Sequence, residues 1–285
     1  MKLLRYGEPG HEKPGLLADD GSIRDLSEHV ADLSGAVLGP DGLRAIAALD
    51  PQALPVVDPA VRLGSPVAGM RNFVCIGLNY ADHAAETGAT APSEPILFLK
   101  SPSALAGPND DIVIPPGSVK TDWECELAVV IGTTARRVPR ARALDHVAGY
   151  TICNDVSERE WQMERGPTWD KGKGFDSFGP LGPWLVTTDA IGDPQALSMF
   201  TEVDGARMQQ GTTANMIFGV ADLVNYVSQC ITLYPGDVIA TGTPAGVGLG
   251  QKPHPVFLRA GQSVRLGIAG LGEQNHRTVS AGRHR

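Results

Sequence analysis

Two acidic residues stand at the start of an apolar segment, where they could bind a cation. Glu124 and Glu126 precede the run 127–131. In a β-strand successive side chains alternate faces, so both carboxylates would lie on one face, with Cys125 on the other. Burying two neighbouring carboxylates costs several kcal/mol unless a cation compensates them. The alternative is that both glutamates line the solvent face of an edge strand.

A third carboxylate completes the candidate metal site. Asp155 ends another apolar run, residues 148–155. Three carboxylates at strand ends make an oxygen-rich site of the kind that Mg²⁺ or Mn²⁺ prefers. Histidine and cysteine ligands beside them are lacking, which argues against zinc. The sequence therefore predicts that Glu124, Glu126 and Asp155 bind Mg²⁺ or Mn²⁺.

An acid–base pair is the second candidate group. His83 and Glu86 are three residues apart, and on a helix such residues are neighbours. A carboxylate fixes the tautomer of the imidazole and raises its basicity, so the pair could take a proton from water. The alternative is a polar pair on a surface helix. Lys173, in the glycine-flanked segment 171–176, could neutralise a substrate carboxylate or an enolate, or it could be an exposed lysine without a role.

The glycine-rich segment 241–248 follows a predicted strand. Its backbone N–H groups and threonine hydroxyls could hold a carboxylate. It matches neither the phosphate-binding loop of ATPases nor the dinucleotide fingerprint. The chain also has no G-x-S-x-G elbow and no H-E-x-x-H helix, which weakens serine-hydrolase and zinc-protease interpretations.

Two units are expected to position these residues: a small N-terminal domain over residues 1–70 and a larger domain over residues 71–285, joined by a proline-interrupted connector. Short apolar runs predict strands and helical spacing predicts helices. The predicted strands are 2–6, 23–26, 73–76, 96–99, 112–114, 123–131, 147–155, 200–203, 206–208, 238–240 and 264–268. The predicted helices are 43–49, 82–87, 158–165 and 217–231. Residues 280–285 are expected to fray.

Composition narrows the class of protein. The formal net charge is −8, which does not favour nucleic acid or an anionic membrane as partner but allows a small anionic substrate. No stretch approaches the ~20 apolar residues of a membrane helix. The N-terminal apolar run is too short for a signal peptide, so we expect a cytoplasmic protein. The four cysteines form no C-x-x-C pair and are expected to be reduced and mostly buried.

The order of these motifs resembles a known family. The series is GLNYADHxxE over 77–86, PILFLK over 95–100, DWExEL over 122–127, NDVS over 154–157, KGFD over 173–176 and TGTPxGVG over 241–248. It closely resembles the fumarylacetoacetate hydrolase family over residues 71–275. Within that family it looks most like the bacterial branch of 2,4-diketo-3-deoxy-sugar-acid hydrolases and acylpyruvate hydrolases, which includes proteins named ureidoglycolate lyase.

The resemblance implies a fold and roles for individual residues. The fold is mixed α/β, mainly β: a mixed β-sandwich roll with a small N-terminal domain, usually as a homodimer. Glu124, Glu126 and Asp155 match the metal ligands, and His83 and Glu86 match a catalytic dyad on a lid helix. Lys173 matches a catalytic lysine, while Gln162, Thr243 and Asn79 are expected to bind substrate.

The implied activity is hydrolysis of a C–C bond in a 2,4-dioxo acid, giving pyruvate and a carboxylic acid. Decarboxylation of oxaloacetate or isomerisation of an oxo acid at the same metal site is the alternative, and ureidoglycolate cleavage ranks below both. A non-catalytic binding protein would require loss of a metal ligand or of the dyad. The three predicted ligands, the two residues of the dyad and Lys173 are all present.

Overall fold

Strand β11 (Cys125–Ile131) lies inside the largest sheet, and it is buried along its whole length. Leu127 and Val129 pack into one hydrophobic core, while Ala128 and Val130 pack into another on the opposite face. A strand that is covered on both faces needs apolar or β-branched residues at its odd-numbered and its even-numbered positions, because these point to opposite faces. The computed structural model, which describes residues 1–282, therefore excludes an edge strand with Glu126 on its solvent face.

The neighbours of β11 bring the acidic residues together. Strand β12 (Val147–Asn154) pairs antiparallel with β11, with Cys125 opposite Asn154. The chain then continues to Asp155, whose backbone N–H donates to the carbonyl of Glu124 at 2.9 Å. On the other side lies β17 (Val238–Ala240), which leads directly into the glycine-rich segment. Three functional segments thus meet at one end of three adjacent strands.

The large sheet follows the order β4-β3-β2-β1-β14-β12-β11-β17-β6-β7, with β5 beside β1 and β8 beside β14. Its remaining strands are β1 (Lys2–Tyr6), β2 (Lys13–Leu17), β3 (Ile23–Asp25), β4 (Val56–Val57), β5 (Leu63–Gly64), β6 (Phe73–Gly77), β7 (Ile96–Lys100), β8 (Leu105–Ala106) and β14 (Gly179–Thr187). Strand β6 runs parallel to β17. The N-terminal strands extend the sheet because β1 pairs antiparallel with β14.

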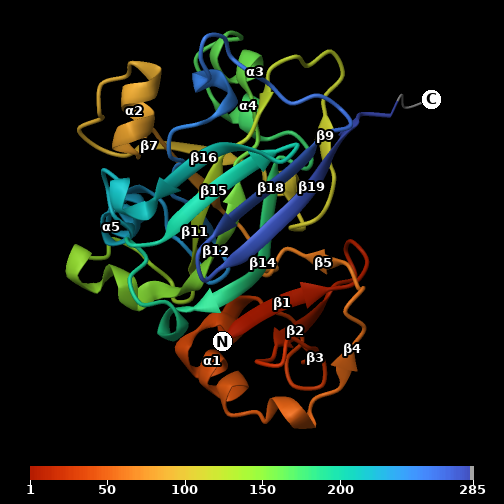
Figure 1. Ribbon diagram of the computed structural model, residues 1–285. Helices are drawn as coiled ribbons and strands as arrows, with labels where there is room; N and C mark the ends of the chain where they lie inside the picture. Colours follow the sequence, from red (N-terminus) through yellow and green to blue (C-terminus); the bar gives the residue numbers. More distant parts are fainter. Residues whose placement is uncertain (283–285) are drawn as a thin grey trace.

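A second sheet packs over the first (Figure 1). Its order is β16-β15-β18-β19-β9, formed by β16 (Ala206–Thr212), β15 (Ser198–Val203), β18 (Ser263–Ile268), β19 (Gly272–Ser280) and β9 (Ile112–Ile114). Asp204 and Gly205, a dipeptide typical of two-residue hairpins, join β15 to β16, and both have the positive φ that such a turn requires, 50° and 79°. A further pair joins β10 (Thr121–Asp122) to β13 (Ser157–Glu158).

The helices are short and flank the sheets. They are α1 (Pro40–Ala47), α2 (Ala81–Thr87), α3 (Arg159–Met163), α4 (Asp170–Lys173) and α5 (Val220–Cys230). Helices α2, α3 and α4 lie at one end of the molecule, and the N-terminal strands lie at the other (Figure 1). None of the helices within residues 1–282 has the length and apolar character needed to cross a membrane.

Most of the predicted elements are present, and the mixed, mainly β architecture is confirmed. Two long strands, β14 and β19, were not expected. Residues 1–70 share a core with the larger unit, since Leu3 and Leu26 pack with Phe73 and Cys75; the domain boundary stays a prediction. Ser280 ends β19 instead of fraying, and residues 283–285 lie outside the described part. Three cysteines are buried, but Cys230 is exposed.

Candidate active site

The three predicted metal ligands converge. Each of Glu124, Glu126 and Asp155 offers a carboxylate oxygen within 4.8 Å of the others, and all three side chains are buried. Glu126 lies in β11, while Glu124 immediately precedes that strand and Asp155 immediately follows β12. The predicted strand 123–131 therefore starts later than expected, at Cys125. The chain leaves regular pairing where the carboxylates gather.

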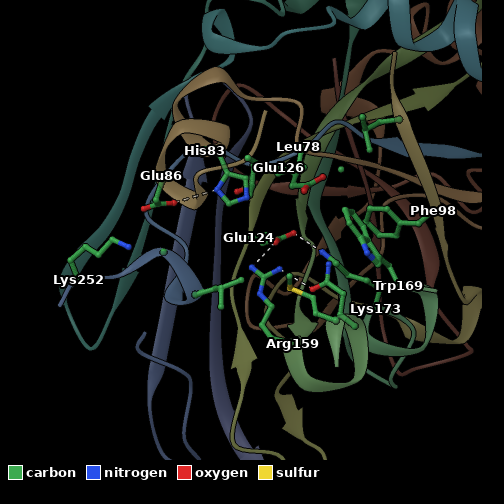
Figure 2. A pocket seen from close by; sticks show the side chains of 18 residues that line it. Leu78, His83, Glu86, Phe98, Glu124, Glu126, Arg159, Trp169, Lys173 and Lys252 are labelled. Carbon is green, nitrogen blue, oxygen red and sulfur yellow. Dashed lines mark hydrogen bonds and ion pairs between the residues drawn. The ribbon is translucent and has the colours of Figure 1, made fainter. Parts of the chain in front are cut away.

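Buried cations partly compensate this acidic cluster. Lys173 Nζ donates to Glu124 Oε2 at 2.7 Å, and Arg159 Nη2 lies 2.7 Å from Glu124 Oε1 (Figure 2). Lys173 Nζ also donates to Asp155 Oδ2 at 2.8 Å. Lys100 Nζ donates to Asp155 Oδ1 at 2.5 Å. Burial alone would raise the pKa of Glu124, but the charges of Lys173 and Arg159 lower it to about 2. Glu124 is thus held as a carboxylate.

Glu126 is the carboxylate that the protein leaves without a cation. Its Oε2 accepts the backbone N–H of Gly242 at 2.9 Å, and no lysine or arginine of residues 1–282 lies within ion-pair distance. Burial, together with the charges of Asp155 and Glu124, raises the pKa of Glu126 well above its usual range. A divalent cation would relieve this repulsion, and the all-oxygen donor set suits Mg²⁺ or Mn²⁺. The residues therefore fit such an ion.

The predicted dyad is formed on α2. His83 Nδ1 lies 3.3 Å from Glu86 Oε2, and both side chains line the same cavity as Glu124 and Glu126 (Figure 2). Tyr80 is the N-cap of this helix. The backbone N–H of Gly246 donates to both Glu86 oxygens, at 2.9 and 3.1 Å. Glu86 is thereby oriented from the glycine-rich segment.

The glycine-rich segment binds carboxylates, but they are the protein's own. Besides Gly242 with Glu126 and Gly246 with Glu86, two further N–H groups reach Asp122. Gly248 N donates to Asp122 Oδ1 at 2.6 Å, and Leu249 N donates to Oδ2 at 2.9 Å. A Cβ on Gly250 would lie 2.3 Å from Glu86 Cδ, so glycine is needed there for close approach. The segment organises the site from one side.

The cavity above the carboxylates has a volume of about 410 Å³. Phe98 and Trp169 form an aromatic wall, with ring centroids 5.5 Å apart, and Lys173 Nζ lies 5.0 Å from the Phe98 ring (Figure 2). A Cβ on Gly77 would lie 2.4 Å from Trp169, so this glycine admits the indole. Lys173 lies at the end of α4, not in an open loop, and Gly172 lets α4 approach Gln162. The complete lining is Ile76, Gly77, Leu78, His83, Glu86, Ala89, Phe98, Glu124, Glu126, Arg159, Gln162, Met163, Trp169, Lys173, Thr243, Leu249, Gly250 and Lys252.

The three predicted substrate-binding residues have different surroundings. Gln162 lines the cavity; its Oε1 accepts from Arg159 Nη1 at 3.0 Å, while its Nε2 has no hydrogen-bond partner among residues 1–282. Thr243 also lines the cavity, but its hydroxyl already donates to the carbonyl of Cys125 at 2.9 Å. Asn79 lies outside the lining, and its amide donates to the carbonyls of Phe218 and Thr241.

Sequence reasoning missed three members of the site: Lys100, Asp122 and Arg159. Lys100 is two residues from the buried Phe98 in β7, so both side chains point to the same face of the sheet. This spacing is the signal that could have identified Lys100 as buried. Asp122 is fully buried and joins Arg159 to the glycine-rich segment. A charged residue beside a candidate ligand is ambiguous in sequence, because it is often solvated.

Comparison with known proteins identifies the family of this chain. The C-terminal domain model of fumarylacetoacetate hydrolases matches residues 72–279. A Burkholderia multivorans protein named "Putative hydrolase" is 62% identical over 281 residues, covering 99% of this chain and 100% of that protein. The chain belongs to the fumarylacetoacetate hydrolase family.

Solved structures show how far the likeness extends. A fumarylacetoacetate hydrolase from Exiguobacterium antarcticum has a TM-score of 0.88 at 38% identity. A maleylpyruvate hydrolase from Sphingobium sp. SYK-6, in complex with manganese(II) and pyruvate, has a TM-score of 0.81 at 30% identity. A 5-carboxymethyl-2-hydroxymuconate delta-isomerase from Mycobacterium smegmatis has a TM-score of 0.78 at 34% identity. Each comparison covers 99% of this chain and 100% of the other.

Proposed function

We propose that this protein is a divalent-metal-dependent hydrolase that cleaves a C–C bond in a 2,4-dioxo acid, releasing pyruvate and a carboxylic acid. One observation carries the proposal: Glu124 and Glu126 of the buried acidic cluster line the same cavity as the His83–Glu86 pair. The manganese and pyruvate in the Sphingobium hydrolase support both the cation and a 2-oxo acid product. The substrate would be a small anion.

Glu124, Glu126 and Asp155 would hold the cation, Mg²⁺ or Mn²⁺. When bound, such an ion supplies positive charge that polarises an oxo group and offsets developing negative charge. Lys100 and Lys173 keep Asp155 in place from two sides. The cluster is buried, so the carboxylates are fixed before substrate arrives and need little rearrangement.

His83 would act as the general base. Its Nδ1 lies 3.3 Å from Glu86 Oε2, which raises the basicity of the ring, and the His83 side chain lines the cavity, where its imidazole would take a proton from water. The water oxygen forms a bond to the distal carbonyl carbon, and the C3–C4 bond then breaks. The electron pair of that bond passes to the pyruvate fragment, which accepts a proton. The distal fragment leaves as the carboxylic acid.

Lys173 would stabilise the negative charge that develops on the pyruvate fragment. An ammonium group has three N–H donors, and Glu124 and Asp155 accept two of them. The third remains for a substrate oxygen, since Lys173 also lines the cavity. Gln162 Nε2 is a second donor without a partner in residues 1–282, and it would bind an oxygen of the same substrate.

A second candidate is isomerisation or decarboxylation of a 2-oxo acid at the same site. The likeness to the Mycobacterium smegmatis isomerase favours it, because the dyad could deliver a proton as well as remove one. Neither reaction needs an attacking water. The two candidates therefore differ in their products and not in the residues that they use.

The test is steady-state turnover of acetylpyruvate and of oxaloacetate, with Mg²⁺ or Mn²⁺ and after chelation. We expect metal-dependent loss of the enol absorbance of acetylpyruvate, with acetate and pyruvate formed in equal amounts. Turnover of oxaloacetate alone would make decarboxylation the main activity. Full activity of the chelated protein would reject the metal-dependent mechanism.

A further inference from the structure

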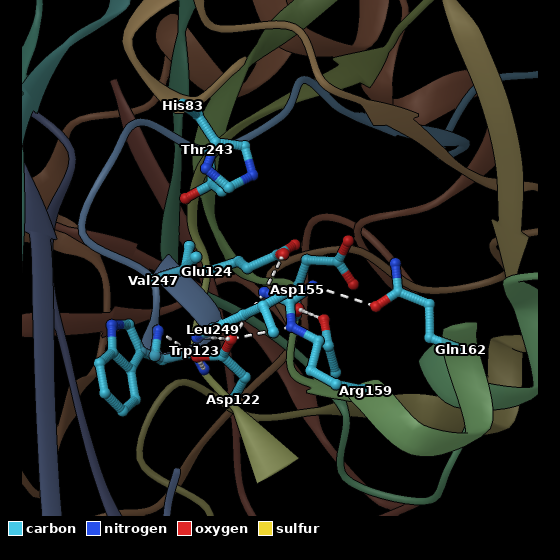
Figure 3. A network of polar contacts seen from close by, with 12 residues as sticks. His83, Asp122, Trp123, Glu124, Asp155, Arg159, Gln162, Thr243, Val247 and Leu249 are labelled. Atoms are coloured by element: carbon cyan, nitrogen blue, oxygen red, sulfur yellow. Dashed lines mark hydrogen bonds and ion pairs between the residues drawn. The ribbon is translucent and has the colours of Figure 1, made fainter. Parts of the chain in front are cut away.

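Asp122 is buried and does not line the cavity, yet it contacts both halves of the site (Figure 3). Its two oxygens accept five hydrogen bonds or ion-pair contacts. They come from the backbone N–H groups of Trp123, Gly248 and Leu249 and from Nε and Nη2 of Arg159. A carboxylate that holds backbone donors on one side and a guanidinium on the other fixes both.

The first half is the acid–base pair. Gly248 and Leu249 donate to Asp122 at 2.6 and 2.9 Å, and Gly246, two residues earlier, holds the Glu86 carboxylate. Gly250, which follows in the chain, packs directly against Glu86, since a Cβ at this position would clash with the carboxylate. Asp122 therefore sets the position of the segment that orients Glu86, although Asp122 touches neither member of the dyad.

The second half is the acidic cluster. Arg159 Nη2 lies 2.7 Å from Asp122 Oδ2 and 2.7 Å from Glu124 Oε1, so one guanidinium bridges the two carboxylates. Its Nη1 donates to Gln162 Oε1 at 3.0 Å. The planar guanidinium has fixed donor directions, so anchoring one edge on Asp122 aims the others. Asp122 thus also orients Glu124 and Gln162.

We propose that Asp122 is a positioning residue that couples the acid–base dyad to the metal centre. Binding of a cation to Glu124 would tighten Arg159 on Asp122, and Asp122 would in turn hold the segment that carries Glu86. The inference rests on the cation proposed above. It does not depend on which substrate is turned over.

The first experiment needs no variant. Hydrogen exchange of peptides covering residues 245–250 is compared in the wild-type protein with and without Mn²⁺. We expect slower exchange at Gly246, Gly248 and Leu249 when Mn²⁺ is bound, although none of them contacts the cluster directly. An unchanged rate with saturating Mn²⁺ would overturn the coupling.

Three substitutions separate the two halves. Asp122→Asn replaces an acceptor oxygen by an amide donor that faces N–H groups, so Mn²⁺ affinity should fall about 10-fold and exchange at 245–250 should rise. Gly250→Ala displaces Glu86 and should lower kcat without changing Mn²⁺ affinity. Arg159→Lys keeps the charge but loses the planar, two-edged guanidinium, so it should weaken Mn²⁺ binding and abolish the Mn²⁺-dependent slowing of exchange at 245–250, while exchange in the metal-free protein stays at the wild-type rate.

Asp237 provides the matched control. It is also a fully buried aspartate outside the cavity lining, and it accepts the backbone N–H groups of Arg71, Asn72 and Tyr234. Asp237→Asn should destabilise the fold while Mn²⁺ affinity and exchange at 245–250 stay as in the wild type. If Asp122→Asn behaves like this control, Asp122 is only structural and the inference is wrong. If the wild-type protein binds no Mn²⁺, the proposed function fails instead, and a rise in exchange at 245–250 in metal-free Asp122→Asn still supports the contact with the segment.

Discussion

His83 Nδ1 lies 3.3 Å from Glu86 Oε2, and the two residues occupy neighbouring positions on α2. The carboxylate faces Nδ1 of the ring, and the His83 side chain lines the cavity. We therefore expect His83→Ala to lower kcat by roughly 10²- to 10⁴-fold, the usual contribution of a general base. Glu86→Gln keeps the shape of the side chain and should lower kcat less. Mn²⁺ affinity, measured by titration calorimetry, should be unchanged in both variants. Wild-type turnover by His83→Ala would refute water activation by this residue.

Asp155 links the acidic cluster to two buried lysines, Lys100 and Lys173. Asp155→Asn should weaken Mn²⁺ binding, and it also leaves two ammonium groups short of a buried counter-charge. Breaking a buried ion pair in this way costs about 3–5 kcal/mol. We expect a lower urea midpoint with an unchanged slope, measured in chelator. Retention of Mn²⁺ at the wild-type level would reject Asp155 as a ligand.

Glu126 should respond differently, because it has no ion-pair partner among residues 1–282. Without metal, folding at pH 7.5 must either bury a Glu126 charge that Asp155 and Glu124 repel or bind a proton there, so Glu126→Gln should raise the melting temperature in chelator. With saturating Mn²⁺ the wild-type protein should have the higher melting temperature, since only the wild-type protein gains the free energy of Mn²⁺ binding. Thermal unfolding under both conditions measures the crossover. A variant that is less stable than wild type in chelator contradicts the repulsion that we describe.

Asp110 predicts an acid dependence of stability outside the cavity. Burial raises its pKa, but hydrogen bonds from Arg62 at 2.6 and 2.8 Å and from Gly107 lower it below the ordinary 3.8 overall. A lowered folded-state pKa gives stability that is present above pH 3.8 and is lost as the pH falls further, because the unfolded chain then binds more protons. Asp110→Asn should therefore lose less stability than wild type between pH 5 and pH 3. Parallel urea midpoints for the two proteins would contradict this.

The carboxylate cluster was predictable because successive side chains of a β-strand alternate between the two faces of the sheet. Once Leu127 and Val129 are apolar, Glu126 must lie opposite them, and the register of β11 with β12 brings Asp155 alongside. The dyad followed from helical spacing, and the hairpin followed from Asp204-Gly205. Metal binding and the homodimer stay predictions.

Long-range polar contacts could not be read from the sequence. Strand β19 was missed because its buried positions carry Gln274, His276 and Thr278 in place of apolar residues. Strand β14 was missed because its glycines and prolines resemble a loop. The role of Asp122 depends on contacts with Arg159 and Gly248, which are separated from it in the sequence by 37 and 126 positions. No local pattern encodes contacts over such separations.

The glycine-rich segment has a consequence for protein engineering. Its contacts with Glu126, Glu86 and Asp122 are made by main-chain N–H groups, so they depend on the spacing of residues 242–249 and on the lack of a side chain at the glycines among them. Deleting or inserting one residue there would shift every donor at once. Substrate range is better redesigned by exchanging Leu249 and Lys252, whose side chains can change while the length of the loop is kept.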